Sequence, residues 1–534
     1  MKRIISLLLV FVLAFGSVGS LICSATPPGY TDTGRPILYI VGQGETLLKP
    51  DGTVVYAVTV PENYIQDSVS DCMPYFLSAI KDGEWDAYRE KLVSVFAPIY
   101  EDIILDENGN SIGGVHADHE YTTDTKCVYQ KAVEKAGKYS TSGNNCYSFY
   151  YDWRLSPYDI LPRLKKAVED IQAASGYDKI NIVGRCEGSA LLLTYLEEYG
   201  TADVKNVEFY VPSCWGVESL SAIFSGNISV DQASLIRYKE QNLDLGDEIL
   251  GQFLEATIDM LAEVYAIDLL SPALTIAIRS LYQKVVPAVL LSCYGTMPGI
   301  WTMVCPDEYE QARDNIFAGV EDKYAGLIEK LDKYYYNVAS RIDEIITDAK
   351  ADGVNFAIIS KYTTYQGVPI CETNYLIGDG ICRTTLSSGG ATTSSITSVL
   401  PDSYIKSAEK NGTAKYISPD KKVDASTCLL PDTTWFIFGS IHKDFPNSIH
   451  TTLMDKFFYS DGKLTVFDDE NIPQYLTYLT ETDTVVPMTA ENGFVTESVE
   501  LPTKKSIKEK ALEFVRKLLT LLASLFEKWL GLGD

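Results

Sequence analysis

The sequence lacks three features that would point to well-known classes of protein. Outside the first 25 residues, no apolar stretch reaches the roughly 18 residues that span a bilayer, so we expect the mature chain to be soluble or peripheral. No CxxC pair occurs, which argues against zinc ribbons and dithiol redox motifs. Positive charge is also scarce: the formal net charge is -27, which would repel a phosphate backbone and argues against nucleic-acid binding.

The first 25 residues have the features of a secretory signal peptide. Two basic residues precede an apolar run at 4–18, and residues 23–25 (Cys-Ser-Ala) offer a cleavage site of the small-x-small type. The bulky Ile22 before Cys23 argues against a lipid-modified cysteine. We therefore expect a secreted, extracellular protein. Export permits disulfides, but the wide scatter of the cysteines does not predict a disulfide scaffold.

Short β-branched or aromatic runs alternate with helical patterns in the body of the chain. These runs are typical of buried parallel strands, because they are short and almost wholly apolar. They lie at 37–41, 146–153, 179–183, 207–211, 354–359 and 435–438, with amphipathic helices expected at 161–174 and 189–198. The alternation predicts an α/β fold with a mostly parallel, doubly wound sheet.

The strand pattern stops after residue 216 and resumes at residue 354. The segment between them contains helical patterns, at 231–266, 272–286 and 309–349. In an open α/β sheet, an insertion that leaves the carboxyl end of a strand lies over the ligand crevice. We therefore expect residues 217–353 to form a helical cap or lid.

The chain is predicted to have five segments. These are a signal peptide (1–25), the first part of the core (26–216), the cap (217–353), the second part of the core (354–503) and a basic amphipathic C-terminal helix (504–534). The Ser-, Thr- and Gly-rich stretch 386–427 is expected to be loop.

The C-terminal segment differs in character from the acidic body. Apolar residues recur every three or four positions within 504–532, and the segment 504–534 holds seven basic and four acidic residues. Such a helix fits three roles, which are peripheral contact with an anionic membrane surface, docking on its own domain and self-association.

The strongest chemical signal is the segment Gly184-Arg185-Cys186-Glu187-Gly188. It has the form G-x-C-x-G and lies between a predicted strand and a predicted helix, which is the context of a nucleophile elbow. On this tight turn the nucleophile has a strained backbone, and side chains two residues before or after it would collide with the neighbouring strand or helix. Cys186 would stand at a helix N-terminus, where the helix dipole stabilises a thiolate.

The stretch 151–157 (YDWRLSP), a helix after it and then 179–188 resemble the lecithin:cholesterol acyltransferase family of α/β-hydrolases. Residues 216–227, with Gly216 and the run FSGN, are also similar to that family. The resemblance covers about residues 35 to 445 and is tight only from 145 to 230. It implies an α/β-hydrolase fold and the hydrolysis or transfer of acyl groups on lipid-like esters.

One departure from the family changes the expected chemistry. The family's nucleophile is serine, and Cys186 stands in its place. Cysteine elbows occur in related folds, such as dienelactone hydrolases and polyhydroxyalkanoate synthases. The resemblance with this departure therefore implies a thioester acyl-enzyme in place of an ester.

The base of a triad can be selected by chain order, because this fold places nucleophile, acid and histidine in that sequence. Histidine is scarce, with four in the chain, and His116 and His119 precede Cys186. The base is therefore His442 or His450. We favour His442, because it follows the predicted strand 435–438 almost directly.

The acid has two candidates. Residues 378–381 (GDGI) are similar to the GDG-x-V segment that carries the acid in the family, which assigns Asp379. Asp483 lies in a second acid-like loop, but no histidine follows it. A plain turn at 378–381 remains a third interpretation.

An oxyanion hole needs two donors aimed at one point. We expect one to be the backbone N-H of Glu187 and the other to come from the loop 41–46, with Gln43 the chosen residue, although that loop also fits an ordinary Gly-rich turn. No metal site and no cofactor is predicted. The pair His116 and His119 lacks further ligands nearby, and the calcium-like run 106–111 has serine where glycine is required.

Two functions of different classes are consistent with the sequence. The first is a secreted acyl-ester hydrolase of lipase or esterase type, or an acyltransferase, that uses Cys186, His442 and Asp379 on a lipid-like or other acyl-ester substrate. The alternative is a catalytically inactive binding or surface protein that keeps the fold with a decayed site. The substrate, the acceptor and the oligomeric state stay open.

Overall fold

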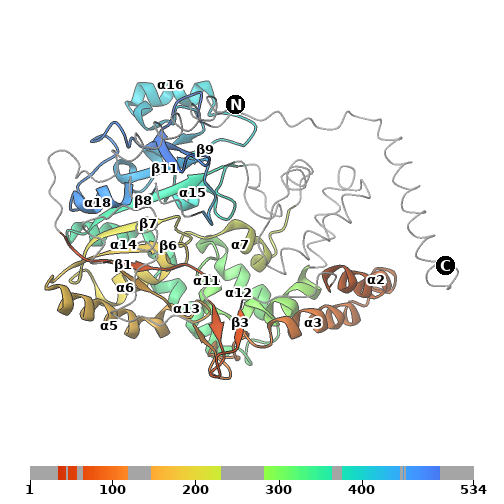
Figure 1. Cartoon of the computed structure of the whole chain (residues 1–534). Coiled ribbons are helices and arrows are strands. Elements are labelled where there is room, and N and C mark those ends of the chain that lie inside the picture. The colour runs from red at the N-terminus through yellow and green to blue at the C-terminus, as the bar shows by residue number, and fades with distance from the viewer. Residues whose placement is uncertain are drawn as a thin grey trace, which may run out of the picture.

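The computed structural model describes residues 34–43, 46–56, 64–117, 146–229, 282–363, 376–444, 449 and 453–493. An eight-stranded sheet runs through the middle of this part of the chain (Figure 1). The strands are, in spatial order, β13 (Thr484–Pro487), β12 (Tyr475–Leu479), β11 (Thr434–Phe438), β8 (Asn355–Tyr362), β7 (Val204–Tyr210), β6 (Ile180–Arg185), β1 (Ile37–Ile40) and β5 (Cys146–Phe149). All neighbouring pairs are parallel except β12 and β13.

The predicted α/β class and the mostly parallel sheet are confirmed. Each of the six predicted strands corresponds to a strand of the sheet, and these strands are almost wholly buried. Burial on both faces explains why they have continuous apolar sequences instead of alternating ones. β12 and β13 were not predicted, because their threonines and exposed positions break the apolar run that marks the other strands.

Helices cover both faces of the sheet. On one face lie α5 (Pro157–Ser175), α6 (Gly188–Tyr199) and α14 (Ile342–Ala351), and α6 contacts both of the others. On the other face, α18 (Asp455–Tyr459) lies over Tyr39 and Val183. The two helices predicted between strands, 161–174 and 189–198, lie within α5 and α6 and are confirmed.

The described parts of the predicted insertion, 217–229 and 282–353, contain helices and no strand. They are α7 (Glu218–Ser225), a helix described over 282–291, α11 (Pro298–Trp301), α12 (Tyr309–Phe317), α13 (Ala325–Asn337), α14 and the short 3-10 helices η2 (Tyr294–Thr296), η3 (Pro306–Glu308) and η4 (Ala339–Arg341). The helix predicted at 272–286 is confirmed over 282–286, and 272–281 lie outside the described residues. Figure 1 shows α7, α11 and α12 beside one end of the sheet. The helix predicted at 231–266 lies outside the described residues.

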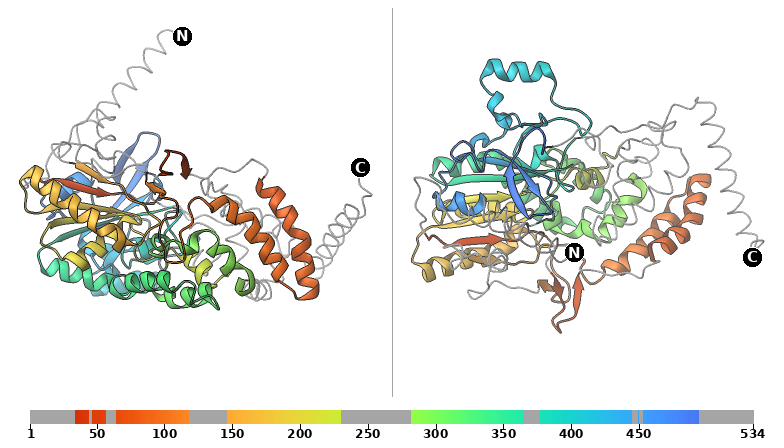
Figure 2. Two further views of the ribbon diagram at one scale, coloured as in Figure 1. Left: turned by 90° about the horizontal axis from the view of Figure 1, so that it is seen from below. Right: turned by 45° about the horizontal axis from the view of Figure 1, so that its top comes forward.

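A helical hairpin projects from the body of the molecule. It consists of α2 (Tyr64–Asp82) and α3 (Asp86–Tyr100), which lie side by side and extend away from the sheet (Figure 2). A small antiparallel sheet of β2 (Leu47–Leu48), β3 (Val54–Tyr56) and β4 (His116–Ala117) lies near the base of the hairpin. Neither feature was predicted.

The prediction that 386–427 is loop was wrong. This stretch contains the second half of α15 (Thr384–Ser387), all of α16 (Asp402–Asn411), the pair β9 (Thr392–Thr393) and β10 (Val423–Asp424), and the 3-10 turns η5 (Ala414–Tyr416) and η6 (Ala425–Thr427). The turn η7 (Pro431–Thr433) follows and leads into β11. α16 has an acidic residue in its first turn and ends at Gly412 in the left-handed conformation. Ala408 is its one fully buried residue, and its mostly polar composition resembles that of a loop.

Three other predictions concern membranes, export and disulfides. No helix in the described residues is long and apolar enough to cross a membrane. The signal peptide 1–25 and the C-terminal segment 504–534 lie outside the described residues. The described cysteines, which are Cys72, Cys146, Cys186, Cys214, Cys293, Cys305, Cys382 and Cys428, are all free thiols.

Candidate active site

Cys186 lies on a strained turn between β6 and α6. Its φ angle is +48°, in the left-handed region that residues other than glycine rarely adopt. The turn is held by backbone hydrogen bonds, because the Cys186 N-H donates to the Tyr210 carbonyl at 3.1 Å and the Ser189 N-H donates to the Cys186 carbonyl at 3.0 Å. Such strain persists only where the surrounding structure over-determines it, and it is typical of functional sites.

The glycines around Cys186 are required by space, as the sequence predicted. A Cβ on Gly184 would lie 3.0 Å from the Cα of Ser189, in α6. A Cβ on Gly188 would lie 2.6 and 2.7 Å from the carbonyls of Val41 and Ile40, at the end of β1. The elbow is therefore packed against a helix on one side and a strand on the other.

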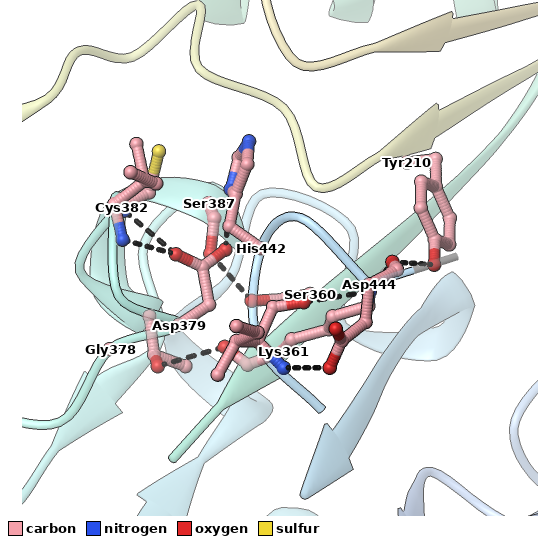
Figure 3. A network of polar contacts seen from close by, with 12 residues as sticks. Tyr210, Ser360, Lys361, Gly378, Asp379, Cys382, Ser387, His442 and Asp444 are labelled. Carbon is pink, nitrogen blue, oxygen red and sulfur yellow. Dashed lines mark hydrogen bonds and ion pairs between the residues drawn. The ribbon is translucent and has the colours of Figure 1, made fainter. Parts of the chain in front are cut away.

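His442 and Asp379 are joined directly. His442 Nδ1 lies 2.8 Å from Asp379 Oδ2, and the His442 backbone N-H donates to the Asp379 carbonyl at 2.7 Å. Figure 3 shows the carboxylate pointing at the ring. Both side chains are buried, with 7% of His442 and 0% of Asp379 exposed. The two residues are 63 positions apart in the chain, so the fold has brought them together.

Asp379 is fixed by its own loop. Its Oδ1 accepts hydrogen bonds from the backbone N-H groups of Ile381 at 3.0 Å and Cys382 at 2.8 Å, which leaves Oδ2 for the imidazole. Such backbone donors favour a carboxylate acceptor. The carboxylate is therefore placed to accept a hydrogen bond from a protonated Nδ1. Nε2 would then be the nitrogen that exchanges protons.

The thiol and the imidazole shift each other's pKa in opposite directions. Burial alone would raise the pKa of Cys186, but charge and hydrogen bonding from His442, with the charge of Arg185, lower it to about 7. Burial would lower the pKa of His442, but the charges of Asp379 and of the Cys186 thiolate raise it to about 10. His442 Nε2 has no hydrogen-bond partner among the described residues, so the ring and the thiol influence each other mainly through charge. Between these two pKa values the favoured form is thus a thiolate paired with an imidazolium.

The three side chains lie at one edge of the sheet. Cys186 follows β6, Asp379 lies in the connection after β8, and His442 follows β11. These strands are parallel, so their carboxyl ends share an edge, which is where open α/β sheets bind ligands.

The rival residues lie elsewhere. Asp483 occupies the turn between β12 and β13, with φ +46°, and its carboxylate accepts a hydrogen bond from the Tyr478 hydroxyl at 3.3 Å. His450 lies outside the described residues. His116 is in β4, and its Nδ1 lies 3.1 Å from the Gly114 carbonyl. Of the candidates that the structure describes, Asp379 and His442 are the ones it brings to Cys186.

The predicted oxyanion donors lie next to the thiol. A Cβ on Gly42 would be 2.9 Å from the Cβ of Cys186, so the loop that carries Gln43 passes directly beside Cys186. In the described part of the chain, no hydrogen bond is formed by the backbone N-H of Glu187 or that of Gln43. The Glu187 side chain is buried, and burial raises the pKa of its carboxyl well above the ordinary value.

The stretch 151–157 serves as an internal tie. The Arg154 guanidinium is fully buried and pairs with Asp152 at 2.6 Å. It also donates to the carbonyls of Ile103 at 2.8 Å and Val115 at 3.2 Å. The Arg154 guanidinium therefore joins the segment that contains Ile103 and Val115 to the segment that follows β5.

Three neighbours of the site were not predicted from the sequence. Lys361 and Asp444 contact the turn that carries His442, and Cys382 follows the acid. One potential metal-ligand group is found within the described ranges, Asp379, Cys382 and His442, with ligand atoms within 4.8 Å of one another. The direct bond between His442 and Asp379 fits an imidazole–carboxylate pair. Of these three neighbours, Lys361 alone had a signal in the sequence, as a lysine within the largely apolar strand NFAIISKY.

No protein-family model matches the chain, and no curated protein was found that matches it.

Proposed function

We propose that the chain is an α/β-hydrolase that cleaves or transfers acyl groups of lipid-like or other esters through a thioester on Cys186. The observation that carries the proposal is the convergence of a strained cysteine, a buried histidine and a buried aspartate at the carboxyl edge of a parallel sheet. Their order in the chain, nucleophile, acid and histidine, is that of α/β-hydrolases.

The first half of the reaction forms the acyl-enzyme. The Cys186 thiolate attacks the ester carbonyl carbon, and the carbonyl π electrons move to oxygen. The His442 imidazolium gives its Nε2 proton to the departing alkoxide as the carbon–oxygen bond breaks, which releases an alcohol and leaves a thioester. Asp379 holds the ring through Nδ1 and stabilises its charged form.

The second half returns the enzyme to its starting state. Neutral His442 takes a proton from water or from an acceptor alcohol, whose oxygen attacks the thioester. The carbon–sulfur bond breaks, the thiolate returns, and the product is a carboxylic acid or a new ester.

The oxyanion that forms in both halves lies at the N-terminus of α6. The N-H of Glu187 and the N-H of Gln43 are the donors that support this part of the proposal, since both flank Cys186. Donors held in place by the fold stabilise such an anion without reorganisation.

We also propose that the protein is secreted, through residues 1–25, and that 504–532 keeps it at a lipid surface. The helices at one end of the sheet would then screen the substrates that reach the thiol.

The test begins with the thiol and does not depend on the substrate. Iodoacetamide at pH 7 should modify Cys186 first, because burial raises the pKa of Cys214, Cys293, Cys305 and Cys428 to about 12. Mass mapping of the alkylated peptide identifies the site. Cys428→Ala is the matched control and should leave the reaction unchanged.

Turnover is tested with p-nitrophenyl esters of increasing chain length. Cys186→Ala and His442→Ala should abolish ester turnover, whereas Cys428→Ala should retain it. A sluggish Cys186 together with no turnover of any ester would instead favour the inactive binding protein.

A further inference from the structure

Lys361 places a buried amino group beside the histidine turn. Its side chain is 0% exposed, and among the described residues the hydrogen-bond acceptors of its Nζ are main-chain carbonyls. The Nζ lies 4.9 Å from the centre of the Tyr210 ring. Burying an ammonium group without a direct counter-ion is costly. Methionine would fill similar space without that cost, so packing alone does not explain a lysine here.

The Nζ of Lys361 spans the turn that carries His442. It donates to the carbonyls of Ile441 at 3.1 Å and Asp444 at 2.6 Å, at the two ends of the turn. Figure 3 shows Lys361 beside Asp444. The turn is closed further by the Asp444 N-H, which donates to the Ile441 carbonyl at 3.1 Å, and by the Ile441 N-H, which donates to Asp444 Oδ2 at 3.0 Å. His442 therefore lies in a loop whose two ends are tied to one lysine.

The main chain around Lys361 holds the acid segment as well. The Thr384 hydroxyl donates to the Lys361 carbonyl at 3.3 Å, and the Thr363 N-H donates to the Gly378 carbonyl at 2.6 Å. Gly378 immediately precedes Asp379. The end of β8 is thus a common support for the acid, through backbone contacts, and for the histidine, through the lysine side chain.

We propose that Lys361 is a positioning residue that sets the imidazole of His442 against Cys186 by clamping the Ile441 and Asp444 carbonyls. This inference rests on the proposed function. The charged groups that act on it are Asp379, Arg185 and Asp444, and the aromatic ring that faces it belongs to Tyr210. Burial lowers the pKa of Lys361 to about 7. The amine and the ammonium both carry N-H donors, so either form can hold the turn.

The test compares two buried lysines that form similar hydrogen bonds to main-chain carbonyls in different parts of the fold. Lys422 is also 0% exposed, and its Nζ donates to the carbonyls of Ser395 at 3.2 Å and Ile396 at 2.9 Å. Lys361→Met and Lys422→Met therefore remove a comparable buried clamp, from the histidine turn and from the 386–427 stretch. The readout is the pH profile of Cys186 alkylation by iodoacetamide, with thiolate absorbance near 240 nm as a second measure.

Lys361→Met should move the midpoint of the profile upward by about one pH unit or more, since a misplaced imidazolium stabilises the thiolate less. Lys422→Met should keep the midpoint of the unchanged protein, even where its thermal stability falls equally. Lys361→Gln, which keeps neutral N-H donors on a shorter side chain, should fall between the two. It also serves as the deciding variant where Lys361→Met does not fold.

The inference is overturned by an unchanged midpoint in the Lys361 variants, or by an equal shift in Lys422→Met. Ester turnover is measured separately on the same samples. Absent turnover together with the expected midpoint shifts would reject the proposed function and leave the positioning role standing. Normal turnover with an unchanged midpoint would support the proposed function and reject the positioning role.

Discussion

Replacing Asp379 by asparagine removes one negative charge from the site with almost no change in volume. Asparagine can still accept the backbone hydrogen bonds from Ile381 and Cys382 through its oxygen. Its amide nitrogen then faces Nδ1 of His442 and is a donor. The ring is therefore expected to place its proton on Nε2, which is the wrong tautomer for a base at Cys186.

The size of the effect follows from the thiol pKa. Cys186 has a pKa of about 7 in place of the ordinary 9.0. Each unit is worth about 1.4 kcal/mol, so the site favours the thiolate by roughly 3 kcal/mol. If Asp379→Asn removed all of it, the thiolate fraction at pH 7 would fall from about one half to about 1%. The more basic thiolate is also more nucleophilic, so we expect alkylation at pH 7 to slow by roughly fivefold to tenfold.

The direction in which the pH profile shifts can be checked independently of the rate at pH 7. The thiolate is the reactive form and exists above the thiol pKa, so a raised pKa moves the rise in rate to higher pH. The assay is the iodoacetamide rate from pH 5 to 10, with Asp483→Asn as the matched control. An unchanged midpoint in Asp379→Asn, or an equal shift in Asp483→Asn, would refute the role given to Asp379.

Three further changes have expected outcomes. Gly188→Ala places a Cβ 2.6 Å from the Val41 carbonyl, and we expect a loss of about 1–3 kcal/mol in urea unfolding together with slower Cys186 alkylation; unaltered stability would contradict the tight packing of the elbow. Asp152→Ala leaves the buried Arg154 guanidinium without its counter-ion, and unfolding should become easier by about 3–5 kcal/mol; a loss below about 1 kcal/mol would show that the pair is not structural. Cys186→Ser should keep the fold but lose nearly all ester turnover, because a hydroxyl is not ionised near neutrality; turnover within a few-fold of the unchanged protein would argue against a thiolate mechanism.

The elbow was predictable because its evidence is local. The two glycines, the cysteine and the flanking strand and helix all lie within about 20 residues, and steric rules tie them together. The structure bears out the positive φ of Cys186 and the contacts that require Gly184 and Gly188. The pairing of His442 with Asp379 was reached by chain order and by likeness, and distance along the chain would not have revealed it.

Features that depend on tertiary burial were not predictable. α16 buries little, and its polar composition resembles that of the loop residues around it. The role of Lys361 depends on where the carbonyls of Ile441 and Asp444 lie, 80 and 83 positions away in the chain. A lysine in a strand suggests a buried polar group and nothing about its acceptors. β12 and β13 were not predicted for a related reason, since an edge pair with exposed positions lacks the apolar run of an inner strand.

A cysteine at the elbow is consistent with the electrostatics around it. With the thiol pKa near 7 and the imidazole pKa near 10, the pair is ionised between these values, so the nucleophile is charged before substrate arrives. His442 then enters the proposed reaction as an acid, and its first task is to protonate the leaving alcohol. Arg185, just before the nucleophile, adds positive charge that a thiolate uses and a neutral hydroxyl does not. A buried Asp379 and a clamped histidine turn both favour the imidazolium, which is the partner that a thiolate requires.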